Sequence, residues 1–431
     1  MQTKQQVSEC IYRVLAERMS HPSASAFHSD AHLRDDLGLD SSSVLQLLVH
    51  LELDHGLALP EEAVMNQDLD TVRQLLEVLH AAQPRPDTGK ILEYEEDIKL
   101  HCFVSCLSEA IKRRAGLEHR VLYFGVWDSG IVVDERLTLS YHSPTIKHDF
   151  FVEWYARLYG VTIEPWYDPR LDKDANAARL VSLVERREPD QHILVMLDMY
   201  QLPERVNEFN KDPFPHYLML GPTARPEAWM VYDPDYRWEG VLQRDRILHA
   251  MQQPSVAGGY VFSTRGAHSP SREQIGAYLE ACLVLGDNPM TTATRRSVTA
   301  HLAGRDDAGR SLPLSHLPEA LDELPILAIR KYAYEHGLAF FWRELNLRED
   351  EFEGWCDEIA RLVKTYKLVQ FQAIKLAATG DRRVADGLFE LLDEQDARET
   401  RIKRRLHEVY GRWLDAIAPA TPVARTSRAS L

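Results

Sequence analysis

The chain has 431 residues, of which 45% are hydrophobic, and its formal net charge at pH 7 is −16. This length predicts two or three domains with packed cores. The acidic balance disfavours nucleic acid as a partner and favours docking onto basic protein surfaces. We see no apolar run of about 18 residues and no charged-then-apolar leader, so neither a membrane nor secretion is expected. The five cysteines are scattered and odd in number, which is typical of a cytoplasmic protein.

The first 80 residues carry a serine at the start of a predicted helix. Gly38 allows a tight loop and Asp40 suits an N-cap, so Ser41 is expected to lie exposed at the helix N-terminus. There the free backbone N–H groups and the positive end of the helix dipole favour a phosphodiester. Apolar residues at helical spacing follow the serine and also mark a first and a last helix: Val44, Leu45, Leu47, Leu48 and Leu51; Val7, Ile11 and Leu15; Val72, Leu75, Leu76 and Leu79.

Residues 1–82 resemble an acyl or peptidyl carrier protein, whose signature is the Leu-Gly-x-Asp-Ser turn found at Leu37–Ser41. The resemblance implies a four-helix bundle with 4'-phosphopantetheine on Ser41. It also implies two protein partners, a phosphopantetheinyl transferase and a ligase that loads an acyl or aminoacyl group. The family usually has an apolar residue after the serine, and Ser42 stands there instead, so Ser42 and Ser43 stay open as attachment residues. Residues 1–84 hold 13 acidic and 5 basic residues, half of the net charge.

Three further segments follow the carrier-like region. Residues 83–90 contain two prolines and a glycine without periodicity and are expected to form a linker. Residues 91–268 show mixed α and β texture, and residues 269–431 are almost wholly helical. The predicted strands lie at 121–124, 193–197, 217–220, 229–232 and 259–262. The predicted helices lie at 102–113, 177–186, 272–285, 317–337, 350–377 and 382–416.

A possible catalytic site lies in the middle region. Cys102 begins a helical pattern, and a helix N-terminus supports a thiolate. His216 stands at the head of one apolar strand and Asp233 at the end of the next, so a hairpin would make them neighbours. A cysteine, then a histidine and an acid on successive strands, is the arrangement in which a base activates a thiol and an acid orients the base. Taken singly, such a cysteine or histidine is more often a packing or hydrogen-bonding residue.

The same region resembles the N-terminal domain of the butirosin biosynthesis acyltransferase family. The motifs that carry the resemblance are His101-Cys102, Phe124-Gly125, Leu197-Asp198-Met199-Tyr200, Leu202-Pro203, His216 and Val231-Tyr232-Asp233-Pro234. It implies a papain-like α+β fold that passes an acyl group from a carrier thioester to an amine. Two features depart from the pattern, because Val126–Gly130 replaces a glycine-rich stretch and Glu96 stands where papain-type peptidases keep a glutamine. The oxyanion donors are therefore open.

Three neighbouring residues have alternative interpretations. Asp198 ends the strand 193–197, where it serves either as a turn cap or in acceptor binding or site orientation. Cys106, one helical turn after Cys102, is the second choice of nucleophile. A metal site at His101, Cys102 and Cys106 lacks a second cluster of ligands, so we expect no metal.

The fusion of a carrier with a thioester-processing region predicts an acyltransferase of secondary metabolism. An acyl or aminoacyl group would pass from Ser41 phosphopantetheine through Cys102, with His216 and Asp233, to a small-molecule amine, aided by tethering. The helical region would cover the site or bind the acceptor. Two alternatives stay open: a thioesterase or cyclase with the same residues, and a carrier fused to a non-catalytic docking scaffold.

Overall fold

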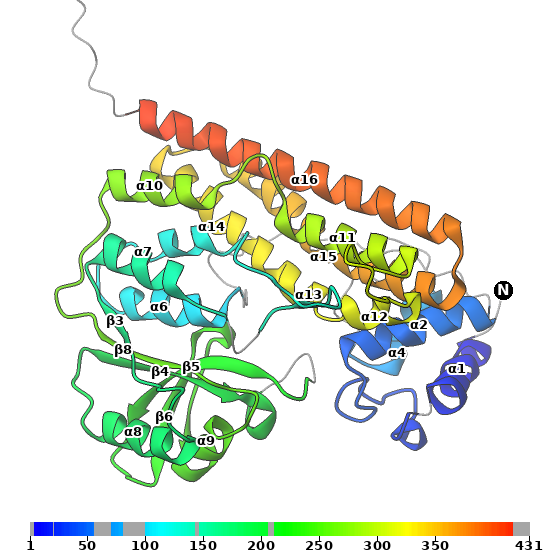
Figure 1. The fold of residues 1–431 in the computed structure, drawn as a ribbon, viewed down its shortest axis with the longest axis horizontal. Helices are drawn as coiled ribbons and strands as arrows, with labels where there is room; N and C mark the ends of the chain where they lie inside the picture. The colour runs from blue at the N-terminus through cyan, green and yellow to red at the C-terminus, as the bar shows by residue number, and fades with distance from the viewer. Residues whose placement is uncertain are drawn as a thin grey trace, which may run out of the picture.

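The computed structural model describes residues 4–19, 21–55, 70–80, 100–142, 146–205 and 211–416. Along the chain it shows a small helical unit, a sheet with helices on both faces, and a set of helices that ends in two long antiparallel ones (Figure 1). The expected linker at 83–90 and Glu96 lie outside the described residues. No helix in the described part is long and apolar enough to cross a membrane.

The N-terminal unit contains α1 (Lys4–Arg13), which continues as the π-helix η1 (Val14–Arg18), then η2 (Ala24–Ala26), α2 (Ser41–His55) and α4 (Val72–His80). Gly38 has φ 66°, the left-handed conformation expected of its turn. Asp40 accepts a hydrogen bond from the Ser43 N–H at 2.6 Å, which confirms the predicted N-cap. The predicted apolar face is buried in one cluster that includes Val7, Ile11, Leu15, Leu47, Leu51, Val72 and Leu75.

A six-stranded antiparallel sheet with the order β3-β8-β4-β5-β6-β7 forms the centre of the middle region. Its strands are β3 (Ile163–Pro165), β4 (Gln191–Asp198), β5 (Pro215–Pro222), β6 (Ala228–Asp233), β7 (Trp238–Gln243) and β8 (Gly259–Ser263). Side chains alternate between the two faces of β4: Leu194 and Met196 enter one core cluster, and Ile193, Val195 and Leu197 enter another. Burial on both faces explains the continuous apolar runs in the sequence.

Helices cover both faces of this sheet (Figure 1). On one face lie α6 (Cys102–Lys112) and α7 (Asp149–Tyr159), and on the other lie α8 (Lys173–Glu185) and α9 (Arg244–Met251). Two 3-10 turns, η4 (Met199–Gln201) and η5 (Pro234–Tyr236), follow β4 and β6. A small separate sheet pairs β1 (Val132–Val133) with β2 (Leu139–Ser140).

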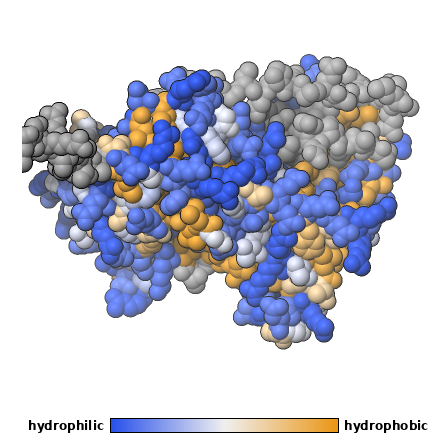
Figure 2. All heavy atoms as spheres, turned by 90° about the horizontal axis from the view of Figure 1, so that it is seen from above, coloured by the Kyte–Doolittle hydropathy of each residue, from blue (hydrophilic) through white to orange (hydrophobic). Residues whose placement is uncertain are grey.

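The C-terminal region is helical, as predicted. It comprises α10 (Arg272–Cys282), α11 (Pro289–Ala303), η6 (Leu314–His316), α12 (Leu317–Ala320), α13 (Leu324–Ala328), η7 (Ile329–Tyr332), α14 (Ala333–Glu344), α15 (Glu349–Thr379) and α16 (Arg382–Asp415). Gly380 in the left-handed conformation ends α15, and the Asp381 side chain caps α16. The view from the side of α16 is mostly hydrophilic with scattered apolar patches (Figure 2), in keeping with the charged outer face of that helix.

Two predictions about individual elements were wrong. Val121–Phe124 is part of the 3-10 helix η3 (Arg120–Gly125), because its apolar side chains pack under α14 and α10 rather than in a sheet. Residues 317–337 form short helices instead of one, since Pro318 and Pro325 each start a new helix. The three-part organisation of helical, sheet-containing and helical regions is confirmed, whereas the specific papain-like fold stays a prediction.

Candidate functional site

Cys102 is the first residue of α6 and is half-buried. Asp235, a residue that the sequence analysis did not single out, binds the backbone just before this helix. Asp235 accepts hydrogen bonds from the backbone N–H of Leu100 at 3.1 Å and of His101 at 3.3 Å, and from Ser105 Oγ at 2.6 Å. The carboxyl group of Asp235 therefore fixes where α6 begins and where the Cys102 side chain lies.

His216 and Asp233 are neighbours on adjacent strands, as the hairpin prediction required. The β5–β6 register pairs Met219 with Tyr232, so His216 and Asp233 project from the same face of the sheet. His216 Nε2 lies 3.0 Å from Asp233 Oδ1, and both side chains are buried. Cys102 is close enough to His216 to help raise the pKa of its imidazole. Because Nε2 is engaged by the carboxylate, Nδ1 is the ring nitrogen left for the thiol.

A fourth residue extends this chain of contacts. Arg205 Nη2 lies 2.5 Å from Asp233 Oδ2, and its guanidinium stacks over the Trp238 ring at 4.1 Å. Burial alone would raise the pKa of Asp233, but His216 and Arg205 hold it below its usual value. Burial would likewise lower the pKa of His216, yet the Asp233 carboxylate and Cys102 hold it well above its usual value. The arrangement therefore favours imidazolium beside an ionised Asp233.

Cys102 and His216 both open onto a cavity of about 330 Å³. Its wall combines residues of the middle region with Ile326, Ile329 and Arg330 of the C-terminal helical region. Arg330 is buried and donates hydrogen bonds to the backbone oxygens of Gly130 and Tyr141 at 3.1 and 2.9 Å. The helical region thus supplies part of the cavity wall.

The cavity is lined by histidines that favour the neutral form. Burial, with neighbouring His142 and Arg330, lowers the pKa of His148 to about 4. Burial also lowers the pKa of His142 to about 4 and that of His101 well below its usual value. Burial lowers the pKa of Arg330 to about 10, so its guanidinium stays charged at neutral pH. Arg330 therefore keeps a positive charge in the cavity wall.

The remaining predicted residues have structural contacts. Asp198 accepts hydrogen bonds from the N–H of Tyr200 and Phe214 at 3.1 and 2.8 Å and from Ser255 Oγ at 3.1 Å, so it caps the turn and anchors the start of β5. Cys106 is buried with Sγ 3.6 Å from the Tyr217 carbonyl oxygen, and burial raises its pKa, which makes it a poor nucleophile. Within the described ranges, no group of three or more His, Cys, Asp or Glu side chains is arranged to hold a metal ion.

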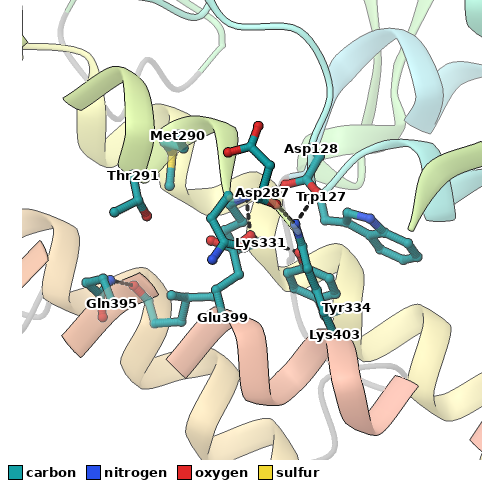
Figure 3. A network of polar contacts seen from close by, with 12 residues as sticks. Trp127, Asp128, Asp287, Met290, Thr291, Lys331, Tyr334, Gln395, Glu399 and Lys403 are labelled. Atoms are coloured by element: carbon teal, nitrogen blue, oxygen red, sulfur yellow. Dashed lines mark hydrogen bonds and ion pairs between the residues drawn. The ribbon is translucent and has the colours of Figure 1, made fainter. Parts of the chain in front are cut away.

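A buried charge network ties the cavity loop to the helical region (Figure 3). Lys331 Nζ lies 2.8 Å from Asp128 Oδ1 and 2.5 Å from Glu399 Oε1, and Lys403 Nζ lies 2.6 Å from Asp128 Oδ2. The Tyr334 hydroxyl donates to Glu399 at 2.8 Å. Asp128 directly precedes the cavity-lining residues 129–132, and Lys331 follows Arg330. The network therefore holds two segments of the cavity wall against α16.

The comparisons with known proteins divide the chain in the same way. Residues 7–79 match the phosphopantetheine attachment site family, residues 97–267 match the DUF6005 N-terminal domain and residues 273–426 match the DUF6005 C-terminal domain. The protein is therefore a phosphopantetheine carrier fused to a two-part DUF6005 region. The resemblance to the butirosin biosynthesis family stays a prediction.

Two curated proteins from Bacillus anthracis each correspond to one part of the chain. Petrobactin synthase is 39% identical over 316 residues, which cover 73% of this chain and 95% of that protein. Acyl carrier protein AsbD is 29% identical over 86 residues, which cover 20% of this chain and 94% of that protein. The chain belongs to the petrobactin synthase family, with an N-terminal carrier domain in addition.

The carrier domain binds 4'-phosphopantetheine covalently, and so it is a substrate for a phosphopantetheinyl transferase and for loading enzymes. The residues around Ser41 fit this group, because α2 begins at Ser41 with Asp40 as its cap and the first backbone N–H groups of a helix are open to an anion. Ser41 as the attachment residue stays a prediction.

Proposed function

We propose that the protein is a cysteine-dependent acyltransferase of secondary-metabolite biosynthesis, which moves an acyl or aminoacyl group from its own carrier to an amine. The observation that carries the proposal is Cys102 and His216 at one cavity, with Asp233 bonded to His216 behind them, in a chain that also holds a phosphopantetheine carrier. Similarity to a protein named petrobactin synthase supports a biosynthetic enzyme. The proposed acceptor is a small-molecule amine.

The cofactor, when bound on Ser41, supplies the acyl group as a thioester. The Cys102 thiolate attacks the acyl carbonyl carbon, a new C–S bond forms, and the departing thiol takes a proton from the His216 imidazolium. The amine then attacks the acyl-Cys102 carbonyl, His216 accepts the amine proton, and Cys102 leaves as thiolate with an amide as product. The free N–H groups at the start of α6 are the proposed oxyanion donors. Asp233, held by Arg205, orients His216.

Mass spectrometry of the full-length chain tests this proposal. The carrier is charged by a phosphopantetheinyl transferase from a panel of acyl-coenzyme A donors, and a panel of amines is then added. We expect wild-type protein to form amide, Ser41→Ala to stay uncharged, and Cys102→Ala to stay charged while transfer falls at least about a thousandfold. His216→Ala should behave nearly like Cys102→Ala.

The buried Cys106 one turn further along α6 provides the matched control. Cys106→Ala should retain transfer, because its thiol faces the Tyr217 carbonyl oxygen in the core rather than His216. Transfer that survives in Cys102→Ala and is lost in Cys106→Ala would refute the assigned nucleophile. Release of free acid or of a cyclic product, with no amide from any amine, would favour the thioesterase or cyclase. A chain that charges but never deacylates would favour the docking scaffold.

A further inference from the structure

One face of α15 packs into the hydrophobic core of the carrier domain. Leu368, Phe371 and Ile374 are spaced three residues apart, so they share one side of the helix. All three belong to the same apolar cluster as the carrier residues, and their side chains are buried. We call Leu368, Phe371, Ile374 and the adjacent Lys375 the α15 docking face.

The carrier meets this face with α2, the helix that begins at Ser41. Glu52 of α2 forms an ion pair with Lys375 at 2.5 Å, and its side chain is 28% exposed. Leu45 and Val49 lie seven and three residues before Glu52 on the same side of α2, and both are buried. Leu47 and Leu51 lie on a different side of α2 and belong to the carrier's own core. The side of α2 that carries Leu45, Val49 and Glu52 therefore faces the α15 docking face.

The segment 322–330 connects the α15 docking face with the cavity wall. Gln370, next to Phe371 on α15, donates from Nε2 to the Asp322 backbone oxygen at 3.1 Å. The following residue, Glu323, accepts a hydrogen bond from the N–H of the cavity-lining Tyr141 at 2.8 Å. Ile326, Ile329 and Arg330, a few residues later, line the cavity itself. A carrier bound to α15 is therefore anchored on the segment that walls the cavity.

We propose that the α15 docking face is the site at which the DUF6005 region binds a carrier. From this site the carrier delivers its phosphopantetheine arm to Cys102. This deepens the proposed function and uses only its assignment of Cys102. The occupant is a phosphopantetheine carrier whose α2 has an apolar stripe and an acid at the position of Glu52. The similar Bacillus anthracis proteins are two separate chains, which supports a face that also takes a carrier from a second chain.

The two kinds of contact have different roles in this docking. Burial of each apolar side chain contributes about 1.5–3 kcal/mol as an upper limit, whereas a partly exposed ion pair contributes about 0–1 kcal/mol. The apolar residues therefore supply most of the affinity. The ion pair between Glu52 and Lys375 selects the partner and its register, because a like charge at either position opposes docking.

A crosslinking probe measures delivery without a need for the natural acyl group or acceptor. The full-length chain is charged with a coenzyme A analogue whose arm ends in a bromoacetamide, so that Cys102 Sγ displaces bromide and a C–S bond to the arm forms. The rate is followed by mass spectrometry, with Cys102→Ala as the blank. Lys375→Glu and Glu52→Lys should each slow the crosslink about fivefold at unchanged charging, because attraction becomes repulsion. The double variant should return to within about twofold of wild type.

The comparison of the double variant with the two single variants separates loss of the ion pair from an effect on folding. A misfolded single variant would not regain its rate on a second substitution, whereas a lost ion pair would. Arg382→Glu, an exposed charge reversal at the start of α16, is the matched control and should leave the rate unchanged. Equal or faster crosslinking in Lys375→Glu would show that the contact stores the carrier away from Cys102 and would overturn the proposal. An amide-forming assay that failed while this crosslink pattern held would refute only the proposed function.

A second experiment uses two full-length chains. One carries Cys102→Ala with Lys375→Glu, so its charged carrier binds its own α15 more weakly. The other carries Ser41→Ala with Glu52→Lys, so its α15 docking face is less occupied by its own carrier. Mixed together, they should crosslink at least about fivefold faster than Cys102→Ala mixed with Ser41→Ala, in which both faces are occupied. Equal rates for the two mixtures would contradict recognition through the α15 docking face.

Discussion

At the scale of single residues, the Asp233 carboxylate contacts both His216 and Arg205. Its Oδ1 faces His216 and its Oδ2 faces Arg205, so the carboxylate lies between two cationic groups. That position explains why its pKa stays below the usual value despite burial, and why the pKa of His216 is held above its usual value against the effect of burial. His216 therefore keeps its proton above the pH at which an isolated histidine loses it, and in the proposed mechanism this proton goes to the departing thiol.

The pH dependence of Cys102 acylation should follow the protonation of His216. The imidazolium form is lost as pH rises through the pKa of His216, so the alkaline limb of the wild-type rate should lie well above pH 6.5, the usual histidine value. Asp233→Asn removes the largest favourable charge beside the imidazolium. The alkaline limb should then move to lower pH and the maximal rate should fall about tenfold. Single-turnover acylation across pH measures both effects.

Asp245 provides a control for the loss of a carboxylate. Asp245→Asn removes an exposed carboxylate, 88% exposed at its side chain, and should leave the profile in place. An Asp233→Asn profile with a lower maximum but an unmoved alkaline limb would mean that Asp233 only supports the fold around Arg205. In that case its charge would have no part in setting the protonation of His216.

At the scale of elements, the cavity depends on contacts between segments far apart in the chain. The loop after η3, the segment η7 and the helix α16 meet at Asp128, Lys331 and Glu399, all drawn in Figure 3. Burial alone would lower the pKa of Lys331, but Glu399 and Asp128 hold it above its usual value. Two lysines and two acids compensate each other, so removal of one partner leaves a buried charge without its counterpart.

Lys331→Met tests this network. We expect a loss of about 3–5 kcal/mol in the stability of the helical region, because Glu399 becomes a buried carboxylate without its lysine. Thermal unfolding of the full-length chain measures the loss. Lys112→Met, at an exposed lysine, should change stability by less than about 0.5 kcal/mol. Addition of Glu399→Gln to Lys331→Met should recover part of the loss, and a double variant no more stable than the single one would refute the charge argument.

The sequence predicted the elements whose pattern is local. The strands β4, β5, β6 and β8, the helix that begins at Cys102 and the long C-terminal helices were confirmed, because burial gives them continuous or periodic apolar runs. The 3-10 helix at Val121–Phe124 was missed because a short apolar run buried under other helices looks the same as a buried strand. Other elements were not anticipated, among them β1, β2, β3, β7, α7, α9 and α11.

The site was predictable to the same extent. Cys102, His216 and Asp233 stand at element ends, where spacing along the chain brings them together, and their roles stay predictions. Arg205, Asp235 and Arg330 were missed. Nothing in the neighbouring sequence distinguishes them from surface charges, because their hydrogen-bond partners are more than 20 residues away along the chain. Glu399 and Lys403, in the charged run 395–405 of α16, are buried, which the charged sequence around them does not indicate.

At the scale of the whole molecule, the carrier and the DUF6005 region are parts of one chain, and the carrier's helix α2 packs on α15. A tethered carrier faces its target at an effective concentration in the millimolar range, far above that of a separate protein at micromolar concentration. Delivery to Cys102 should therefore be a property of a single molecule.

The last prediction follows from this tethering and uses full-length chains only. The half-time for acylation of Cys102 by a charged wild-type chain should be independent of protein concentration between about 0.1 and 10 µM, since the reaction is intramolecular. A mixture of charged Cys102→Ala with Ser41→Ala must react between molecules. At about 1 µM it should be slower by about a thousandfold, and its rate should rise in proportion to concentration. If the wild-type half-time shortened in the same proportion, carriers would be delivering between chains, and the fusion would keep the two parts in equal amounts without speeding the transfer.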